Sequence, residues 1–183
     1  MAAGPARAAG SELPRAECVA AIVALALEVT ALDALPSGSI PVAVYQSGPG
    51  ALRAQAAARV AVAAGADALV SWGLVGGLDP SLHPGDIVLP ERGLTPAGAR
   101  WRAHSGWHAA LERALAAPFR VHTGALMSVT EVLASPLAKR TAAESSGAVA
   151  VDMEAADVAA VAADAGIPFV AVRIVADASD DSL

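Results

Sequence analysis

Short apolar runs alternate with alanine-rich, helix-forming segments along most of this chain, and this alternation is the strongest constraint on its fold. The apolar runs are rich in the β-branched residues that favour strands, and the segments between them have helical spacing. Strands separated by helices form a largely parallel sheet that is covered on both faces. We therefore expect an α/β fold, a three-layer α/β/α sandwich with a largely parallel but mixed central sheet. The expected strands are 19–25, 42–45, 68–72, 86–89, 121–127, 148–151 and 169–175, and the expected helices are 51–64, 99–116, 136–144 and 153–165.

One domain accounts for the chain, because residues 18–183 are too few for two such sandwiches. Hydrophobic residues make up 55% of the sequence but aromatic residues only 3%, so we expect a core of closely packed Ala, Val, Leu and Ile. Residues 1–17 are rich in Ala, Gly and Pro without periodicity, which favours a flexible leader. The apolar run 18–27 is too short to span a membrane and fits a buried first strand better than a secretion signal.

Charge and cysteine usage narrow the possible partners and location. The chain has 12 basic and 18 acidic side chains, a formal charge of -6, and so lacks a basic stripe for nucleic acid. Its single cysteine, Cys18, has no partner within the chain, which fits a reducing compartment and predicts a cytoplasmic protein.

Four polar or glycine-rich segments follow expected strands. They contain Glu28, Gly76-Gly77, Met153-Glu154 and Asp177. Ligands of parallel α/β sheets bind beyond the carboxyl ends of the strands, so these segments are expected to converge on one pocket. Taken singly, each carboxylate also fits a solvated helix end, and the glycine pair also fits a tight turn.

The same segments resemble the motifs of the purine nucleosidase and nucleoside phosphorylase superfamily. Val151-Asp152-Met153-Glu154 looks like its methionine–glutamate signature, and Arg173-Ile174-Val175-Ala176-Asp177 looks like its arginine-to-aspartate segment. Gly73 to Gly77 and Glu28-Val29-Thr30 resemble its glycine-rich loop and its first-strand glutamate. The resemblance implies a nucleoside phosphorylase-like fold and cleavage of a nucleoside.

Within that superfamily, the chain resembles the hopanoid-associated branch. The resemblance rests on the segments 71–80 and 84–90, together with Gly48-Pro49-Gly50 and Gly147-Ala148. It implies release of adenine from adenosylhopane in hopanoid biosynthesis.

The resemblance also implies roles for individual residues. Asp177 would protonate the purine as it leaves, Glu28 would activate the attacking water, and Arg173 would orient Glu28. Such an acid–base pair is what breaking an N-glycosidic bond needs. Glu154 would accept hydrogen bonds from the ribose hydroxyls, and Met153 would form an apolar wall against the sugar. Gly76 and Gly77 would border the nucleoside, and Val132 and Leu133 match the positions that hold adenine.

Water and phosphate remain alternative nucleophiles. A phosphorylase would need an anion site, and the segments typical of that site are missing here, although Arg53 could bind phosphate at a helix start. We expect no metal and no organic cofactor. His104 and His108 have helical spacing but lack the catalytic glutamate of a zinc motif.

Two other functions remain open. A methylthioadenosine or adenosylhomocysteine nucleosidase, or a purine nucleoside phosphorylase, would share the chemistry, whereas a non-catalytic nucleoside-binding protein would share only the pocket. The family resemblance further implies a homodimer, and a lipid substrate implies access to a membrane surface. It also implies a helix after Asp177, so the domain is expected to be short at its C-terminus, since the sequence ends at Leu183.

Overall fold

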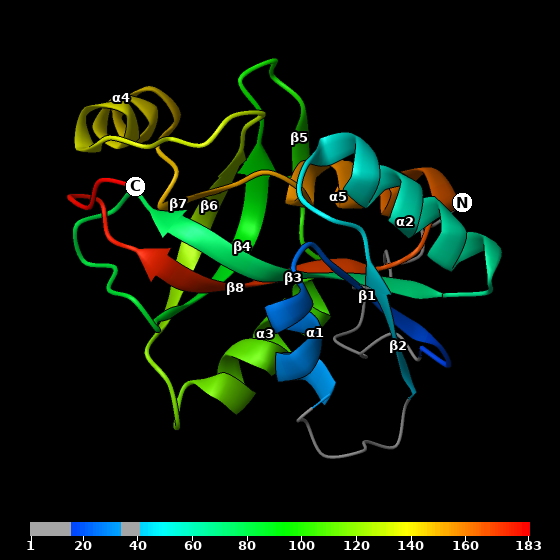
Figure 1. The fold of residues 1–183 in the computed structure, drawn as a ribbon. Helices are drawn as coiled ribbons and strands as arrows, with labels where there is room; N and C mark the ends of the chain where they lie inside the picture. The colour runs from blue at the N-terminus through cyan, green and yellow to red at the C-terminus, as the bar shows by residue number, and fades with distance from the viewer. Residues whose placement is uncertain (1–15, 34–40) are drawn as a thin grey trace, which may run out of the picture.

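A computed structural model describes residues 16–33 and 41–183, which form eight strands and five helices (Figure 1). The strands are β1 (Val19–Val23), β2 (Val42–Gln46), β3 (Ala68–Gly77), β4 (Ile87–Leu94), β5 (Arg100–Arg102), β6 (Val121–Ser128), β7 (Ala150–Asp152) and β8 (Phe169–Asp177). The helices are α1 (Ala26–Asp33), α2 (Ala51–Ala63), α3 (Ser105–Leu115), α4 (Pro136–Ser146) and α5 (Ala155–Ala165). The leader predicted over residues 1–17 lies, except for its last two residues, outside the described residues.

The sheet is mixed and largely parallel, as the alternating pattern predicts. Its order is β2-β1-β3-β7-β6-β4-β5, and β8 pairs with both β3 and β4. The pairs β3–β7, β4–β8 and β4–β5 are antiparallel, and the other pairs are parallel. Because β3, β7, β6, β4 and β8 pair in a closed circuit, the centre of the sheet curls into a small ring of strands. The ends of β3, β7 and β8 therefore lie close together.

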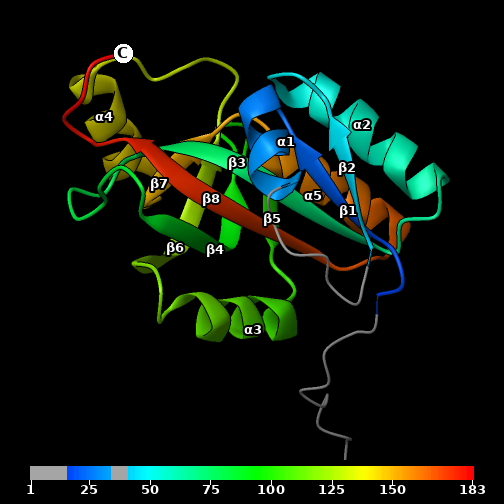
Figure 2. The same cartoon turned by 60° about the horizontal axis from the view of Figure 1, so that its bottom comes forward.

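Helices cover both faces of this sheet, which confirms the three-layer prediction. In Figure 1, α2 and α5 lie on one side of β3 and β8, and α1 and α3 lie on the other. Figure 2 shows α4 apart from these layers, beside the C-terminus at one end of the sheet. None of the helices in residues 16–33 and 41–183 is long and apolar enough to cross a membrane.

The core between α2, α5 and the sheet is built from small aliphatic side chains, as the composition predicts. Ala54, Ala58 and Ala61 of α2 are fully buried, and so are Val158 and Ala162 of α5. Alanine has no side-chain rotamers to lose in a helix and lets neighbouring elements approach closely. The abundance of alanine thus reflects tight packing of α2 and α5.

Two parts of the sequence prediction were wrong. The predicted helix 99–116 is divided into β5, which pairs antiparallel with β4, and the shorter α3, which begins after its N-cap residue His104. The glycine-rich segment after residue 72 is the second half of β3, and it pairs with both β7 and β8. In both cases, strand pairing overrides the local sequence preference. β5 pairs with its neighbour β4 in a hairpin, whereas the end of β3 pairs with strands that are distant in the sequence. Helix α1 was not predicted at all.

Gly93 provides a test of how the β4–β5 hairpin packs. A Cβ atom at Gly93 would lie 2.1 Å from Trp101 Cε2, and the Trp101 ring packs edge-on against Phe169 with 5.1 Å between ring centroids. We expect Gly93→Ala to displace the indole ring and lower the free energy of unfolding by about 1–3 kcal/mol, as overpacking does. Urea denaturation measures the change. Ala97→Ser, at an exposed site in the same hairpin, is the control and should leave stability unchanged.

Candidate functional site

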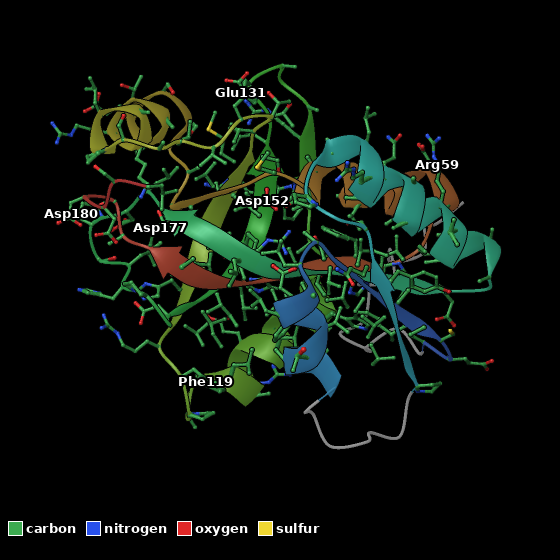
Figure 3. The ribbon with its side chains drawn as sticks, in the orientation of Figure 1. Arg59, Phe119, Glu131, Asp152, Asp177 and Asp180 are labelled. Carbon is green, nitrogen blue, oxygen red and sulfur yellow. The ribbon has the colours of Figure 1, made fainter. Side chains whose placement is uncertain are left out.

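A cavity of about 340 Å³ opens where β3, β7 and β8 end and where α1 and α5 begin. Figure 3 shows Asp177 at the tip of β8 and Asp152 at the end of β7. The volume lies in the usual range of small-molecule sites, about 300–1,000 Å³. Its wall combines carboxylates with apolar side chains: Ala24, Leu25, Glu28, Pro49, Leu74, Val75, Gly76, Val129, Val132, Leu133, Lys139, Val151, Asp152, Met153, Glu154, Ala176, Asp177 and Leu183.

Glu28 enters the cavity from the first turn of α1 and is held by backbone N–H groups. Its Oε2 atom accepts hydrogen bonds from the N–H groups of Ala24 and Leu25, both at 2.8 Å, and its Oε1 atom accepts one from Leu74 at 3.0 Å. The residue is 3% exposed. A helix N-terminus has unpaired N–H groups and favours negative charge, so the carboxylate both caps α1 and is fixed by it.

Gly73 is required by the close approach of Glu28 to β3. A Cβ atom at position 73 would lie 2.7 Å from Glu28 Oε1, which is closer than real Cβ contacts come. The glycine segment is thus a strand rather than the predicted loop, and Gly73 leaves room in it for a carboxylate.

Asp152 and Arg173 form a buried ion pair beneath the cavity. The Nη2 atom of Arg173 donates to Asp152 Oδ2 at 2.6 Å and to Ser71 Oγ at 2.7 Å, and Arg173 Nε donates to Asp152 Oδ2 at 3.2 Å. Asp152 also accepts hydrogen bonds from Ser128 Oγ at 2.6 Å and from the N–H of Ala155 at 2.8 Å. The two charged side chains are 0% and 2% exposed. Every oxygen of the buried carboxylate is therefore paired.

This arrangement alters the role expected for Arg173. Arg173 and Glu28 adjoin the same small hollow, but the hydrogen bonds of Glu28 come from backbone N–H groups and those of Arg173 go to Asp152 and Ser71. Arg173 therefore acts on the network under the site. Sequence reasoning did not assign a role to Asp152, although it belongs to the motif that contains Met153 and Glu154.

Glu154 is the N-cap residue of α5 and lies beside Met153 in the cavity wall. Its Oε1 atom accepts a hydrogen bond of 2.7 Å from the N–H of Gly50, so it joins the beginnings of α2 and α5. Burial raises the pKa of Glu154, and the nearby negative charge of Asp152 adds to the increase, whereas the Gly50 hydrogen bond and Arg173 oppose it.

Asp177 ends β8 and forms an ion pair with Lys139 of α4. The Nζ atom of Lys139 donates hydrogen bonds to Asp177 Oδ1, to the carbonyl of Ala178 at 2.6 Å and to the carbonyl of Asp181 at 3.2 Å. The Lys139 side chain is 1% exposed and that of Asp177 is 14% exposed. The sequence contains no spacing signal for this pair, because it depends on where α4 packs relative to β8.

The remaining predicted site residues divide into two groups. Gly76, Val132 and Leu133 line the cavity, and Val132 is 59% exposed at its edge. Gly77 lies behind the wall, against the backbone of Asp177, and Arg53 is an exposed residue of α2 outside the lining.

The two histidines considered as metal ligands have other contacts. His104 caps α3 by accepting a hydrogen bond from the N–H of Trp107, and a ring nitrogen of His108 lies 2.9 Å from the carbonyl oxygen of Leu89. Across residues 16–33 and 41–183, no three His, Cys, Asp or Glu side chains are grouped so that they could hold a metal ion.

The buried ion pair predicts a large loss of stability when one partner is removed. We expect Asp152→Ala to lower the free energy of unfolding by about 3–5 kcal/mol, because it leaves the Arg173 guanidinium buried without a counter-charge. A double variant, Asp152→Ala with Arg173→Met, should recover part of that loss. Urea denaturation distinguishes these outcomes, and Asp164→Ala, at an exposed position of α5, is the matched control. If the single and double variants lost the same free energy of unfolding, the unpaired Arg173 charge would not be the cause of the loss.

The raised pKa of Glu154 predicts a pH dependence with a definite sign. The folded protein binds this proton more tightly than the unfolded chain does, so ionisation destabilises the fold as pH rises above the ordinary value of 4.5. Glu154→Gln removes that cost. We therefore expect its stability relative to the parent to increase between about pH 4 and pH 7, measured by urea denaturation. Glu144→Gln, at an exposed position of α4, should show no such trend.

Solved structures with the same architecture include several bacterial nucleosidases. The S-adenosylhomocysteine nucleosidase of Streptococcus pyogenes, in complex with 5-methylthiotubericidin, is 18% identical, with a TM-score of 0.83 over 92% of this chain and 87% of that chain. The 5′-methylthioadenosine/S-adenosylhomocysteine nucleosidase of Neisseria meningitidis, in complex with methylthio-immucillin-A, is 24% identical, with a TM-score of 0.79 over 90% and 87%. Futalosine hydrolase of Helicobacter pylori is 19% identical, with a TM-score of 0.79 over 90% and 86%. These similarities establish the fold.

Two comparisons of the sequence gave different results. None of the curated proteins matches the chain, whereas a family model does. The family model described as the phosphorylase superfamily matches residues 29–183, which includes the segments of Gly76, Glu154 and Asp177. This match confirms the superfamily resemblance on which the site prediction depended. The chain therefore belongs to the phosphorylase superfamily.

Proposed function

We propose that this protein hydrolyses the N-glycosidic bond of an adenine nucleoside and releases adenine. The observation that carries the proposal is a single cavity whose wall contains Glu28, Glu154 and Asp177, three carboxylates from distant parts of the chain. Cleavage of this bond proceeds through an oxocarbenium-like sugar, and needs a proton for the leaving base and a nucleophile on the opposite face. Two of these carboxylates supply those needs and the third binds the sugar.

Asp177 and Glu28 have different hydrogen-bond partners, which suits them to two different roles. Asp177 contacts Lys139, a group that carries protons, and it delivers a proton to N7 of the purine. Glu28 is held by three backbone N–H groups and takes a proton from the attacking water. General acid–base catalysis of this kind contributes about 10²–10⁴-fold to the rate.

Arg173 supports this chemistry from below the cavity. Its ion pair with Asp152 links the end of β7 to β8, and Asp152 also caps the start of α5. That pairing fixes the backbone from which Glu154 projects. Arg173 is thus a positioning residue in this proposal, acting through Asp152.

The sugar and base have matching surfaces in the wall. Glu154 accepts hydrogen bonds from the ribose 2′ and 3′ hydroxyl groups, because an ionised carboxylate has two acceptor oxygens. Met153 packs against the sugar, and Val132 and Leu133 enclose the adenine ring. Their positions in one cavity support this orientation of the nucleoside.

Water is a better candidate than phosphate for the nucleophile. Lys139 is the cationic side chain among the described residues that line the cavity, and its N–H groups are already directed at Asp177, Ala178 and Asp181. Arg53, the candidate phosphate ligand, is exposed and lies outside the lining. A phosphate site needs cationic or N–H donors free to face the ligand.

The 5′ substituent of the substrate is proposed to be apolar. Leu25, Val129 and Leu183 contribute further apolar side chains to the cavity wall. This wall, together with the resemblance to the hopanoid-associated branch, favours adenosylhopane. The short thioether of methylthioadenosine is the principal alternative, since the related nucleosidases are bound to methylthio compounds.

The decisive experiment incubates the protein with adenosylhopane or methylthioadenosine, with and without phosphate, and identifies the base and the sugar released. We expect adenine and a free sugar at a rate that does not depend on phosphate. A sugar 1-phosphate would establish phosphorolysis instead. Tight nucleoside binding without turnover would favour a non-catalytic binding protein.

Variants of the two carboxylates test the assigned roles. We expect Asp177→Asn and Glu28→Gln each to lower kcat by about 10²–10⁴-fold, because each removes one proton transfer. Asp180→Asn, at an exposed position near Asp177, is the matched control and should keep the parental rate (Figure 3). Undiminished adenine release by Asp177→Asn would overturn the assignment of the acid.

A further inference from the structure

The ion pair between Lys139 and Asp177 raises a question about the proton that adenine requires. An ammonium group and a carboxylate together have no net charge, and the one proton that can move between them is on the ammonium group. Asp177 in its ionised form has no proton to donate, so the proposed acid needs a source for it. Lys139 donates a hydrogen bond directly to Asp177 Oδ1 and is therefore the nearest source.

The surroundings of Lys139 favour a proton that stays within the pair. The side chain is 1% exposed, and its two other acceptors are the neutral backbone carbonyls of Ala178 and Asp181. Within residues 16–33 and 41–183, Asp177 thus provides the one negative charge that Lys139 contacts directly. Water reaches the pair through Asp177, whose side chain is 14% exposed and faces the cavity.

A nucleoside that fills the cavity changes the balance between two forms of the pair. The ammonium–carboxylate form and the amine–carboxylic acid form contain the same number of protons. Charged groups are penalised when water is removed, whereas the neutral form is penalised much less. Substrate binding covers the exposed part of Asp177 and so favours movement of the proton from Lys139 to Asp177.

We infer that Lys139 holds the proton that Asp177 delivers to the leaving adenine. This inference rests on the proposed function. When substrate binds, Lys139 Nζ gives its proton to Asp177 Oδ1. Asp177 then gives a proton to purine N7 as the C1′–N9 bond breaks with its electron pair moving to the purine. Lys139 is then a neutral amine and Asp177 is again a carboxylate. Glu28 takes a proton from the attacking water. After the products leave, Glu28 releases that proton to solvent and the amine regains one from solvent.

Substitution of Lys139 by two different residues separates proton transfer from charge and packing. Lys139→Arg keeps a positive charge and several N–H donors, but a guanidinium group does not release a proton in a protein. Lys139→Met keeps the length of the side chain and removes both charge and proton. Arg140→Met, at an exposed position of the same helix, is the matched control.

The assay compares adenine release with hydrolysis of nitrophenyl β-riboside, whose leaving group departs as an anion without protonation. We expect both Lys139 variants to lose about 100-fold or more in kcat for the adenine nucleoside, the typical contribution of an acid, while keeping most of their activity on the nitrophenyl riboside. The Arg140→Met control should match the parent on both substrates.

Each contrary outcome has a separate meaning. Adenine release at the parental rate by Lys139→Arg would show that only charge is needed and would overturn the inference, whether or not the parent accepts the nitrophenyl riboside. Equal losses on both substrates would indicate a purely structural role and would also overturn it. A parent protein that cleaves neither substrate would remove the proposed function, and this inference with it.

Discussion

The buried ion pair between Asp152 and Arg173 is the interaction on which the rest of the site depends. Two charges removed from water are tolerated only when their hydrogen-bonding groups are satisfied. Here Ser71 of β3, Ser128 of β6 and the N–H of Ala155 at the start of α5 complete the set. Satisfying one ion pair therefore requires four strands and a helix to meet in a single arrangement. That arrangement closes the ring of strands beneath the cavity.

Two carboxylates that share the cavity have different hydrogen-bond partners. Glu28 is held by backbone N–H groups at a helix start, whereas Asp177 is held by the ammonium group of Lys139. A backbone N–H group is too weak an acid to give its proton to a carboxylate, but an ammonium group can do so. Under the proposed mechanism, these different partners give two chemically similar groups different roles, one as a base and one as an acid.

The sequence was sufficient to predict the layered fold and part of the cavity wall. Local patterns reveal alternating elements, and strand ends indicate where ligands bind, so Glu28, Glu154 and Asp177 could be grouped from sequence. Interactions between distant elements could not be predicted in this way. The role proposed for Lys139 depends on the packing of α4 against the end of β8. The contact of Gly73 with Glu28 likewise exists only after β1 and β3 have paired.

The carboxylates and the apolar residues of the cavity wall lie on different kinds of structural element. The carboxylates proposed to react lie at strand ends and helix starts, which the buried network and backbone hydrogen bonds fix in place. The apolar residues Val132 and Leu133 lie in the connection between β6 and α4, and Val132 is largely exposed. Connections of this kind tolerate substitution better than the elements they join. Changes there can alter which nucleoside is accepted without disturbing the ion pair below, so the chemistry of this site is more strongly constrained by its structure than its specificity is.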